Sequence, residues 1–311
     1  MTTRSSYSPR AYRVAVDIRG AKTLMVEGVS DRRIILRSCA SKKNYHRTKF
    51  VIDTAQIIEA TEGESVGNKE KVLEVFELLK ESGSFGIFVD REWDGLTDPV
   101  SGVWLPYTPA NTGEEPKFFT SGHSIENYSF TLDLYRQAIL STCYESVGDN
   151  SIPDLESSFQ PALDMGLAFS KVFRELGIFG KSKSCVTPDD FSWSGDNQLS
   201  INPAAHFCKT LNDRGCNLPE DVVDRILASY SSPDLPEGAP TSFYLHGHLG
   251  ELVLRASLSS KLRSLGVPDP VSQSYFNERP DIRDMRLREY YANKGELPAS
   301  IEIVVSFLLA K

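Results

Sequence analysis

Thr23-Leu24-Met25-Val26-Glu27-Gly28 and Phe85-Gly86-Ile87-Phe88-Val89-Asp90 are the two stretches of sequence that decide the fold. Each is a short apolar run that ends at an acidic residue. Such runs, bounded by Gly or Asp, are typical of strands buried within a sheet. In an open α/β sheet, functional side chains collect beyond the carboxyl ends of the strands. We therefore expect Glu27 and Asp90 to lie at such an edge.

More acids follow the second run. Glu92 and Asp94 continue from Asp90 at every second residue, so an extended chain would point all three carboxylates the same way. Converging carboxylates repel one another unless a hard cation lies between them, and oxygen-only ligation suits Mg²⁺ or Mn²⁺. The alternative is a solvent-exposed acidic turn, with Arg91 and Trp93 facing away into packing.

A third acidic position is Glu126, in the string His123-Ser124-Ile125-Glu126-Asn127-Tyr128. If a helical turn begins here, the three-residue spacing puts His123 and Glu126 on one side. His123 would then donate to a phosphate or orient a water. The alternative for His123 is a surface or hydrogen-bonded structural histidine, and Asn127 and Tyr128 are expected to cap and pack.

Strands and helices alternate in the first part of the chain, which predicts a right-handed parallel α/β sheet. Beyond residue 131 the helical period dominates, so we expect two domains, 1–130 and a mainly helical 131–311. The elements expected are strands at 12–18, 24–26, 50–52 and 85–89, one possible strand at 103–105, and helices at 31–40, 69–81, 132–144, 159–176, 219–228 and 251–265. Residues 301–309 fit a final strand or a docking helix.

Composition limits the classes of function. A hydrophobic content of 40% with 24% charged residues is that of a soluble globular protein. No apolar stretch approaches the ~20 residues of a membrane span, and the polar, basic start MTTRSSYSPRAYR is unlike a secretory signal. Five scattered cysteines without a Cys-x-x-Cys pair argue against a zinc cluster or disulfide framework, so a cytoplasmic location is expected.

A net charge of −8 argues against coating of nucleic acid by bulk electrostatics, yet one segment is basic. Between residues 32 and 52 there are seven Lys or Arg and no acid, whereas residues 53–81 hold eight acids and three lysines. The basic segment could hold phosphates beside a metal site, or be a solvated helix face balanced by the acidic stretch. Its candidate phosphate contacts are Arg32, Arg33, Arg37, Lys42, Lys43, Arg47 and Lys49.

Two further patterns bear on function. His246 and His248 form a His-x-His pair, which needs other ligands to bind a metal, and the cysteines are not positioned to supply them. No GxxxxGK[ST] or GxGxxG motif is present, which argues against nucleotide hydrolysis or dinucleotide binding within this chain.

Taken in this order, the acidic elements resemble the TOPRIM domain, the metal-binding module of topoisomerases, primases and OLD-type nucleases. Leu24-Met25-Val26-Glu27-Gly28 matches the family's Glu after its first core strand. Phe88-Val89-Asp90-Arg91-Glu92 matches its Asp-x-Asp, with Glu92 in place of the second Asp. The string around Glu126 resembles the distal acidic motif of the OLD-type branch. Length and motif order are similar to the AriB-type effectors of the two-gene PARIS antiphage systems.

The resemblance implies a Mg²⁺- or Mn²⁺-dependent endonuclease, with Glu27, Asp90, Glu92, Asp94 and Glu126 as metal ligands. Catalysis would involve Glu27, Asp90, Glu126 and His123. It implies a toxic effector that cleaves a host nucleic acid, with RNA such as tRNA favoured over DNA. The effector would act once it is released from an AriA-like ABC-type ATPase that senses a phage-encoded trigger. A homodimer is left open as the active form. A TOPRIM binding or regulatory module with a degenerate metal site is the alternative. A primase or topoisomerase would need nucleotide-binding elements or a nucleophilic-Tyr domain that the sequence does not show.

Overall fold

The computed structural model describes residues 6–59, 67–109, 115–148, 151–195, 197–202, 205–294 and 296–310. The chain forms two compact units. The first contains Met1–Arg91, Thr108–Ser121 and Leu287–Lys311, and the second contains Glu92–Tyr107 and Gly122–Arg286. These units do not follow the expected division at residue 130, because each is assembled from separated stretches of sequence.

A four-stranded sheet forms the centre of the first unit. Its strands are all parallel and lie in the order β2-β1-β3-β4, which confirms the predicted parallel α/β sheet. Val26 of β1 pairs with Thr54 of β2 on one side and with Phe88 of β3 on the other. The central strands β1 and β3 are buried almost throughout, as their continuous apolar sequences predict. The bounds are β1 Lys22–Val26, β2 Phe50–Thr54, β3 Phe85–Val89 and β4 Lys117–Phe119.

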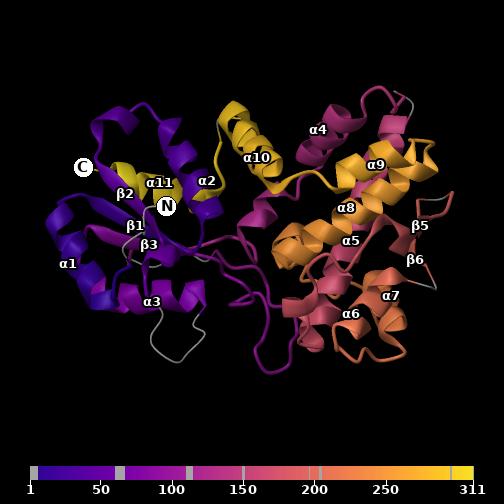
Figure 1. Cartoon of the computed structure of the whole chain (residues 1–311), viewed down its shortest axis with the longest axis horizontal. Helices are drawn as coiled ribbons and strands as arrows, with labels where there is room; N and C mark the ends of the chain where they lie inside the picture. Colours follow the sequence, from indigo (N-terminus) through magenta and orange to yellow (C-terminus); the bar gives the residue numbers. More distant parts are fainter. Residues whose placement is uncertain are drawn as a thin grey trace. The chain divides into compact units, whose positions relative to one another are not determined.

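Helices cover both faces of this sheet. Helices α1 (Pro9–Arg19) and α3 (Asn68–Leu79) lie on one face, and α2 (Val29–Ala40) and α11 (Ala299–Leu309) on the other (Figure 1). Gly86 on β3 has no room for a larger side chain, because a Cβ there would stand 2.9 Å from the carbonyl oxygen of Pro116 and 3.0 Å from the ring of Phe307. Helix α11 also settles the open choice for residues 301–309 in favour of a docking helix.

The strand predicted at residues 12–18 is wrong, because these residues belong to α1. The side chain of Ser8 accepts a hydrogen bond from the Ala11 N–H, and Pro9 occupies the first helical position, a combination that starts a helix. Tyr12 and Val16, four residues apart, are buried, whereas Ile18 is 79% exposed. The apolar residues therefore follow the helical period, with one buried face.

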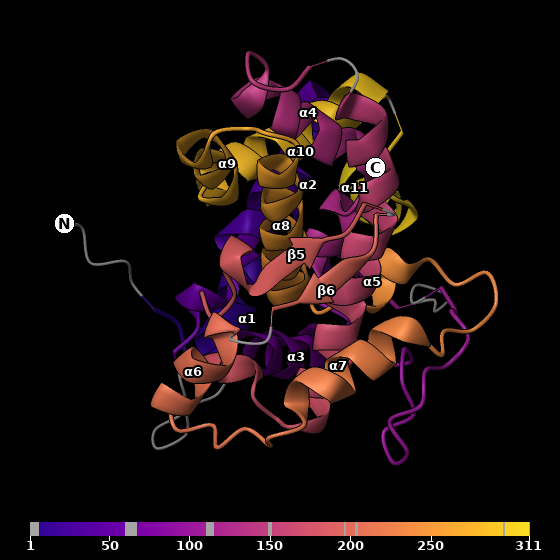
Figure 2. The same ribbon diagram turned by 90° about the vertical axis from the view of Figure 1, so that its right-hand side faces the viewer.

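The second unit is mainly helical, as predicted for this part of the chain. Helices α5 and α8 pack along one another and supply a large part of its core (Figure 2). Beside them lies a β-hairpin that the sequence did not indicate. The strand predicted at 103–105 is not formed, and Trp104 makes only an isolated bridge with Thr97. The bounds are α4 Leu132–Cys143, α5 Ile152–Glu175, β5 Phe191–Trp193, β6 Leu199–Ile201, α6 His206–Asp213, α7 Val222–Ser231, α8 Gly247–Ser264, α9 Asp269–Phe276 and α10 Pro280–Lys294.

Candidate functional site

Glu27 and Asp90 come together at the carboxyl edge of the sheet. They follow the neighbouring parallel strands β1 and β3 directly, and the backbone N–H of Asp90 donates to Oε1 of Glu27 at 2.8 Å. Both residues are half-buried, so the edge remains open to solvent. Two acids 63 positions apart in the sequence thus meet in one place, as the strand pattern predicts.

The turn after Glu27 is held by the start of α2. The backbone N–H of Gly28 donates to Oδ2 of Asp31 at 2.8 Å, so the carboxylate of Asp31 caps the helix. The N-cap residue is Gly28. Asp31 is therefore a structural acid that fixes the backbone next to Glu27.

A second strand-end acid, Asp53, has a structural role of a different kind. Its carboxylate accepts hydrogen bonds from the Tyr12 hydroxyl at 2.8 Å and from the Arg19 guanidinium. Burial, together with the nearby charge of Asp53, raises the pKa of Tyr12 well above its ordinary value. Asp53 thereby joins α1 to the edge of the sheet.

The expected alternation of Asp90, Glu92 and Asp94 is wrong, because the chain turns sharply between them. Glu92 has a φ of 56°, in the left-handed region, and its N–H donates to the His123 carbonyl oxygen at 2.6 Å. Asp90 belongs to the first unit, while Glu92 and Asp94 belong to the second and are exposed. An extended run of three aligned carboxylates is thus not formed.

Arg91 and Trp93 pack, as the alternative interpretation of this segment expected. Arg91 is only 4% exposed, and its N–H donates to Oγ1 of Thr120 at 2.9 Å. Its guanidinium donates to the carbonyl oxygen of Thr108 at 2.7 Å, and its own carbonyl accepts from the buried Lys69 at 3.4 Å. Sequence reasoning missed Thr120 and Lys69, since nothing local shows that they meet residue 91. Together these contacts fix the backbone just after Asp90.

The string around Glu126 forms a capped 3-10 helix, Ile125–Ser129, in the second unit. The Ser124 N–H donates to Oδ1 of Asn127 at 2.6 Å, and Nδ2 of Asn127 donates to the Leu245 carbonyl oxygen at 3.0 Å. Tyr128 is buried, so Asn127 and Tyr128 cap and pack as expected. The helical turn starts after His123, so the spacing argument for pairing His123 with Glu126 does not apply.

Glu126 lies instead at the first turn of α8. A Cβ on Gly247 would stand 2.7 Å from Oε2 of Glu126 and 2.0 Å from Oγ of Ser124, so only glycine fits at that position. Oε1 of Glu126 is 3.5 Å from Nδ1 of the exposed His248. An anionic side chain at a helix N-terminus is favoured by the helix dipole, which gives Glu126 a structural role whatever its chemistry.

His123 is buried in an aromatic cluster. Its ring centroid lies 4.4 Å from that of Trp93 and 4.7 Å from that of His246. Burial, and secondarily the charge of His248, lowers the pKa of His246 to about 4. The imidazole of His246 is therefore neutral at pH 7. Both rings pack within the second unit, and the surface position considered for His123 is wrong.

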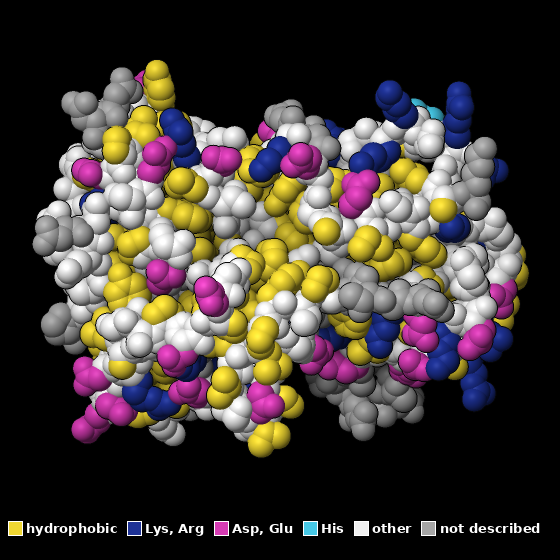
Figure 3. Space-filling model, turned by 180° about the vertical axis from the view of Figure 1, so that it is seen from behind, with side chains coloured by type: hydrophobic (Ala, Val, Ile, Leu, Met, Phe, Trp, Pro, Cys, Tyr) yellow, Lys and Arg dark blue, Asp and Glu magenta, His cyan; other side chains and the backbone are white. Residues whose placement is uncertain are grey.

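The basic segment is largely solvated. Only Lys42 is partly covered, and its ammonium lies 2.9 Å from Oε2 of Glu302 on α11. Figure 3 shows acidic and basic side chains intermixed over much of one face of the protein, with several Lys and Arg gathered at its upper right. The exposed members of the set are Arg32, Arg33, Arg37, Lys43, Arg47 and Lys49.

The carboxyl edge can be tested for its fit to a divalent ion. Among the described residues, no group of three or more His, Cys, Asp or Glu is arranged to hold a metal. Magnesium, however, is commonly bound by one or two carboxylates, with water and substrate phosphates completing its shell. Glu27 and Asp90, with oxygen donors only and partial exposure, fit that mode of binding.

Comparison with known proteins adds no relative. No protein-family model matches the chain, and neither does any curated protein. Within the described ranges, every helix is too short or too polar to cross a bilayer. The function of this chain must therefore be argued from its own residues.

Proposed function

We propose that this chain is a metal-dependent endonuclease of the TOPRIM type, with Glu27 and Asp90 at its catalytic centre. The observation that supports this best is the 2.8 Å hydrogen bond from the Asp90 N–H to Glu27, which brings two acids together across neighbouring strands.

In this proposal Glu27 and Asp90 bind Mg²⁺ or Mn²⁺, which when bound polarises the scissile phosphate and stabilises the leaving oxygen. Asp90 is held in place by the ordered backbone that follows it, where Thr120 and Lys69 bind the N–H and the carbonyl of Arg91. The Asp90 N–H fixes the carboxylate of Glu27 in turn. Preorganised groups of this kind lower the cost of reaching the transition state.

The exposed basic residues of α2 and the segment after it would bind the phosphate backbone. Such contacts position a strand without reading its sequence. Because they depend on charge, binding should weaken as salt concentration rises.

Cleavage of single-stranded RNA and of tRNA in Mg²⁺, with and without a chelator, tests the proposal. We expect Glu27→Gln and Asp90→Asn to lower the rate by at least about a hundredfold, the scale of losing a group that stabilises transition-state charge. Asp17→Asn is the matched control, because Asp17 is an exposed acid of the same unit, on α1. Full activity in both site variants would eliminate this assignment.

The biological setting is proposed from the resemblance to antiphage effectors. The substrate would be a host RNA such as tRNA, and an AriA-like ABC-type ATPase would restrain the chain until a phage protein acts on the ATPase. Expression of the chain alone, and with such an ATPase and trigger, tests this. Toxicity that is the same with and without the ATPase would contradict restraint.

A binding or regulatory module with a degenerate metal site is the second candidate. It is favoured by Glu92, which replaces the expected second Asp and sits exposed at a left-handed turn. Magnesium would then raise the melting temperature by binding the folded state, without any cleavage of RNA or DNA. Cleavage that depends on Asp90 would exclude this candidate.

A further inference from the structure

A cavity of about 840 Å³ is lined by residues of the second unit alone, and Glu27 and Asp90 are not among them. It is lined by the loop that follows α5, the first turns of α8, the end of α9 and the start of α10. Its volume falls within the ~300–1,000 Å³ of sites that hold small molecules. The chemistry of the lining indicates what it would bind.

Aromatic rings form part of the lining. Phe179 and His246 are stacked, with centroids 4.1 Å apart and planes 19° apart, and Phe276 at the end of α9 supplies a further ring. Nδ1 of His246 accepts a hydrogen bond from the Leu249 N–H at 3.3 Å. In the neutral ring the hydrogen is then on Nε2, which is a donor. The ring of Phe276 and the edges of the stacked pair, beside the Nε2 donor, suit a planar heterocycle.

Positive charge is in excess on the polar side of the lining. Lys183, Arg255 and Arg283 contribute three cations against the carboxylates of Glu251 and Glu278. Glu251 is 3.1 Å from a guanidinium nitrogen of Arg283. Burial raises the pKa of Glu251, and the neighbouring arginines counteract part of that rise.

Glu278 is shared by two arginines. It lies 2.6 Å from Arg286, which is outside the lining, and 3.5 Å from Arg255. Its charge is therefore already compensated. In a chain whose net charge is −8, the lining thus has one more cationic side chain than carboxylates, which favours an anionic ligand.

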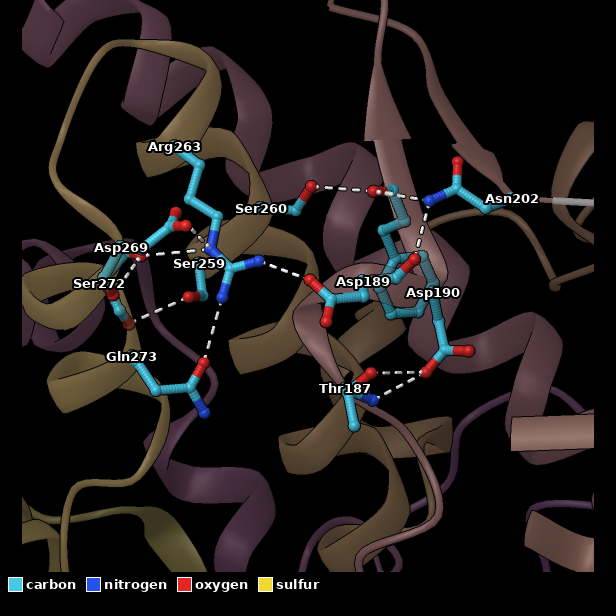
Figure 4. Close-up of polar contacts among 11 residues, drawn as sticks. Thr187, Asp189, Asp190, Asn202, Ser259, Ser260, Arg263, Asp269, Ser272 and Gln273 are labelled. Atoms are coloured by element: carbon cyan, nitrogen blue, oxygen red, sulfur yellow. Dashed lines mark hydrogen bonds and ion pairs between the residues drawn. The ribbon is translucent and has the colours of Figure 1, made fainter. Parts of the chain in front are cut away.

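The walls of the cavity are held by a separate hydrogen-bond network (Figure 4). Arg263 on α8 donates to Oε1 of Gln273 on α9 at 3.0 Å and also pairs with Asp189. The N–H of Thr187 donates to Oδ2 of Asp190 at 2.7 Å. Gln273 and Thr187 both line the cavity, so the lining is fixed before any ligand arrives.

We propose that this cavity binds a nucleoside 5′-phosphate, with the base against Phe276 and the Phe179–His246 pair and the phosphate at Lys183 and Arg283. The ligand is either a free nucleotide or one nucleotide of a single strand. The site goes beyond the proposed cleavage reaction and does not depend on it, because its residues and its test involve no metal.

Calorimetric titration of the full chain in a buffer with EDTA tests the proposal. The probes are 5′-AMP, 5′-UMP, adenosine, inorganic phosphate and a short single-stranded RNA. We expect Lys183→Ala to weaken binding by about tenfold, the scale of one charge-assisted hydrogen bond. Lys181→Ala is the matched control, because Lys181 lies two residues away, outside the lining. Phe276→Leu keeps an apolar side chain but removes the ring, and should also weaken the binding of the nucleotides.

The outcomes separate the two sources of the ligand. Saturable 1:1 binding of a mononucleotide, tighter than that of adenosine or phosphate, supports a free nucleotide. Binding of the RNA alone, weakened by Lys183→Ala, supports a nucleotide within a strand. No saturable binding, equal affinity in the Lys183→Ala and Lys181→Ala variants, or phosphate bound as tightly as 5′-AMP would overturn the proposal. Asp90→Asn should bind like wild type, so failure of the catalytic proposal would be recognised separately.

Discussion

Replacing His246 with asparagine should remove a pH dependence from the stability of the second unit. His246 is the N-cap of α8, and asparagine can accept the same Leu249 N–H without titrating. Burial, and secondarily His248, lowers the pKa of His246 from 6.5 to about 4. The unfolded chain therefore binds a proton between these pH values that the folded chain excludes.

The sign and size of the effect follow from this difference. Because the unfolded state holds more protons, wild-type stability falls as the pH drops from 6.5 toward about 4, and the loss levels off below that. The free energy involved is about 3 kcal/mol. His246→Asn loses the stacking on Phe179 at every pH, which adds a constant offset. The other acids and histidines of this region are unchanged between the two proteins, so the comparison isolates the contribution of His246.

Urea unfolding followed by tryptophan fluorescence reports the stability of the second unit, because Trp93, Trp104 and Trp193 all lie in it. The free energy of unfolding of the wild type, minus that of His246→Asn, should fall by about 3 kcal/mol between pH 7 and pH 4. His206→Asn, at the exposed first position of α6, is the control and should show no such change. A wild-type to variant difference that is constant over this range would refute the reasoning.

Three further predictions concern packing and capping. In thermal unfolding, Gly86→Ala should destabilise the first unit by about 1–3 kcal/mol, because its Cβ overpacks against the chain before β4 and against α11. The control Gly83→Ala has open space at its Cβ and should change the free energy of unfolding by less than about 0.5 kcal/mol. Gly247→Ala should lower the free energy of unfolding by about 1–3 kcal/mol, because its Cβ would clash with Ser124 and Glu126. Its control Gly180→Ala, with open space at the Cβ, should leave the stability nearly unchanged. Ser8→Ala should cost about 1 kcal/mol by removing the N-cap of α1 in circular-dichroism melts, and no loss would show that this cap does not matter.

The strands of the central sheet could be predicted from sequence because their burial is uniform. β1 is apolar from Leu24 to Val26 and β3 at every position, and each strand is followed directly by an acid that cannot continue a buried strand. The meeting of Glu27 with Asp90 followed from the same pattern, because neighbouring parallel strands end at the same edge. Here local sequence and tertiary structure agree.

The region after Asp90 could not be predicted, because its conformation is set by distant residues. The turn at Glu92 is fixed by the carbonyl of His123, and Arg91 is buried against Thr108 and Thr120. Nothing in the local sequence indicates these partners, so the sequence alone led us to expect an extended chain.

The error at α1 has a different origin. Over seven residues, the apolar pattern of 12–18 is compatible with both a strand and a helix, and Ser8-Pro9 was the signal that decides between them. The string around Glu126 was recognised, but its contact with Gly247 joins residues more than a hundred positions apart. Only the folded chain reveals that this acid lies at the start of α8.

A crystal grown with Mn²⁺ and measured at the manganese absorption edge shows whether Glu27 and Asp90 together bind a metal, because anomalous scattering locates the ion itself. We predict a manganese peak within coordination distance, about 2.0–2.3 Å, of carboxylate oxygens from both Glu27 and Asp90, and its loss in Asp90→Asn. Manganese bound only elsewhere, or retained at this edge without Asp90, would contradict it.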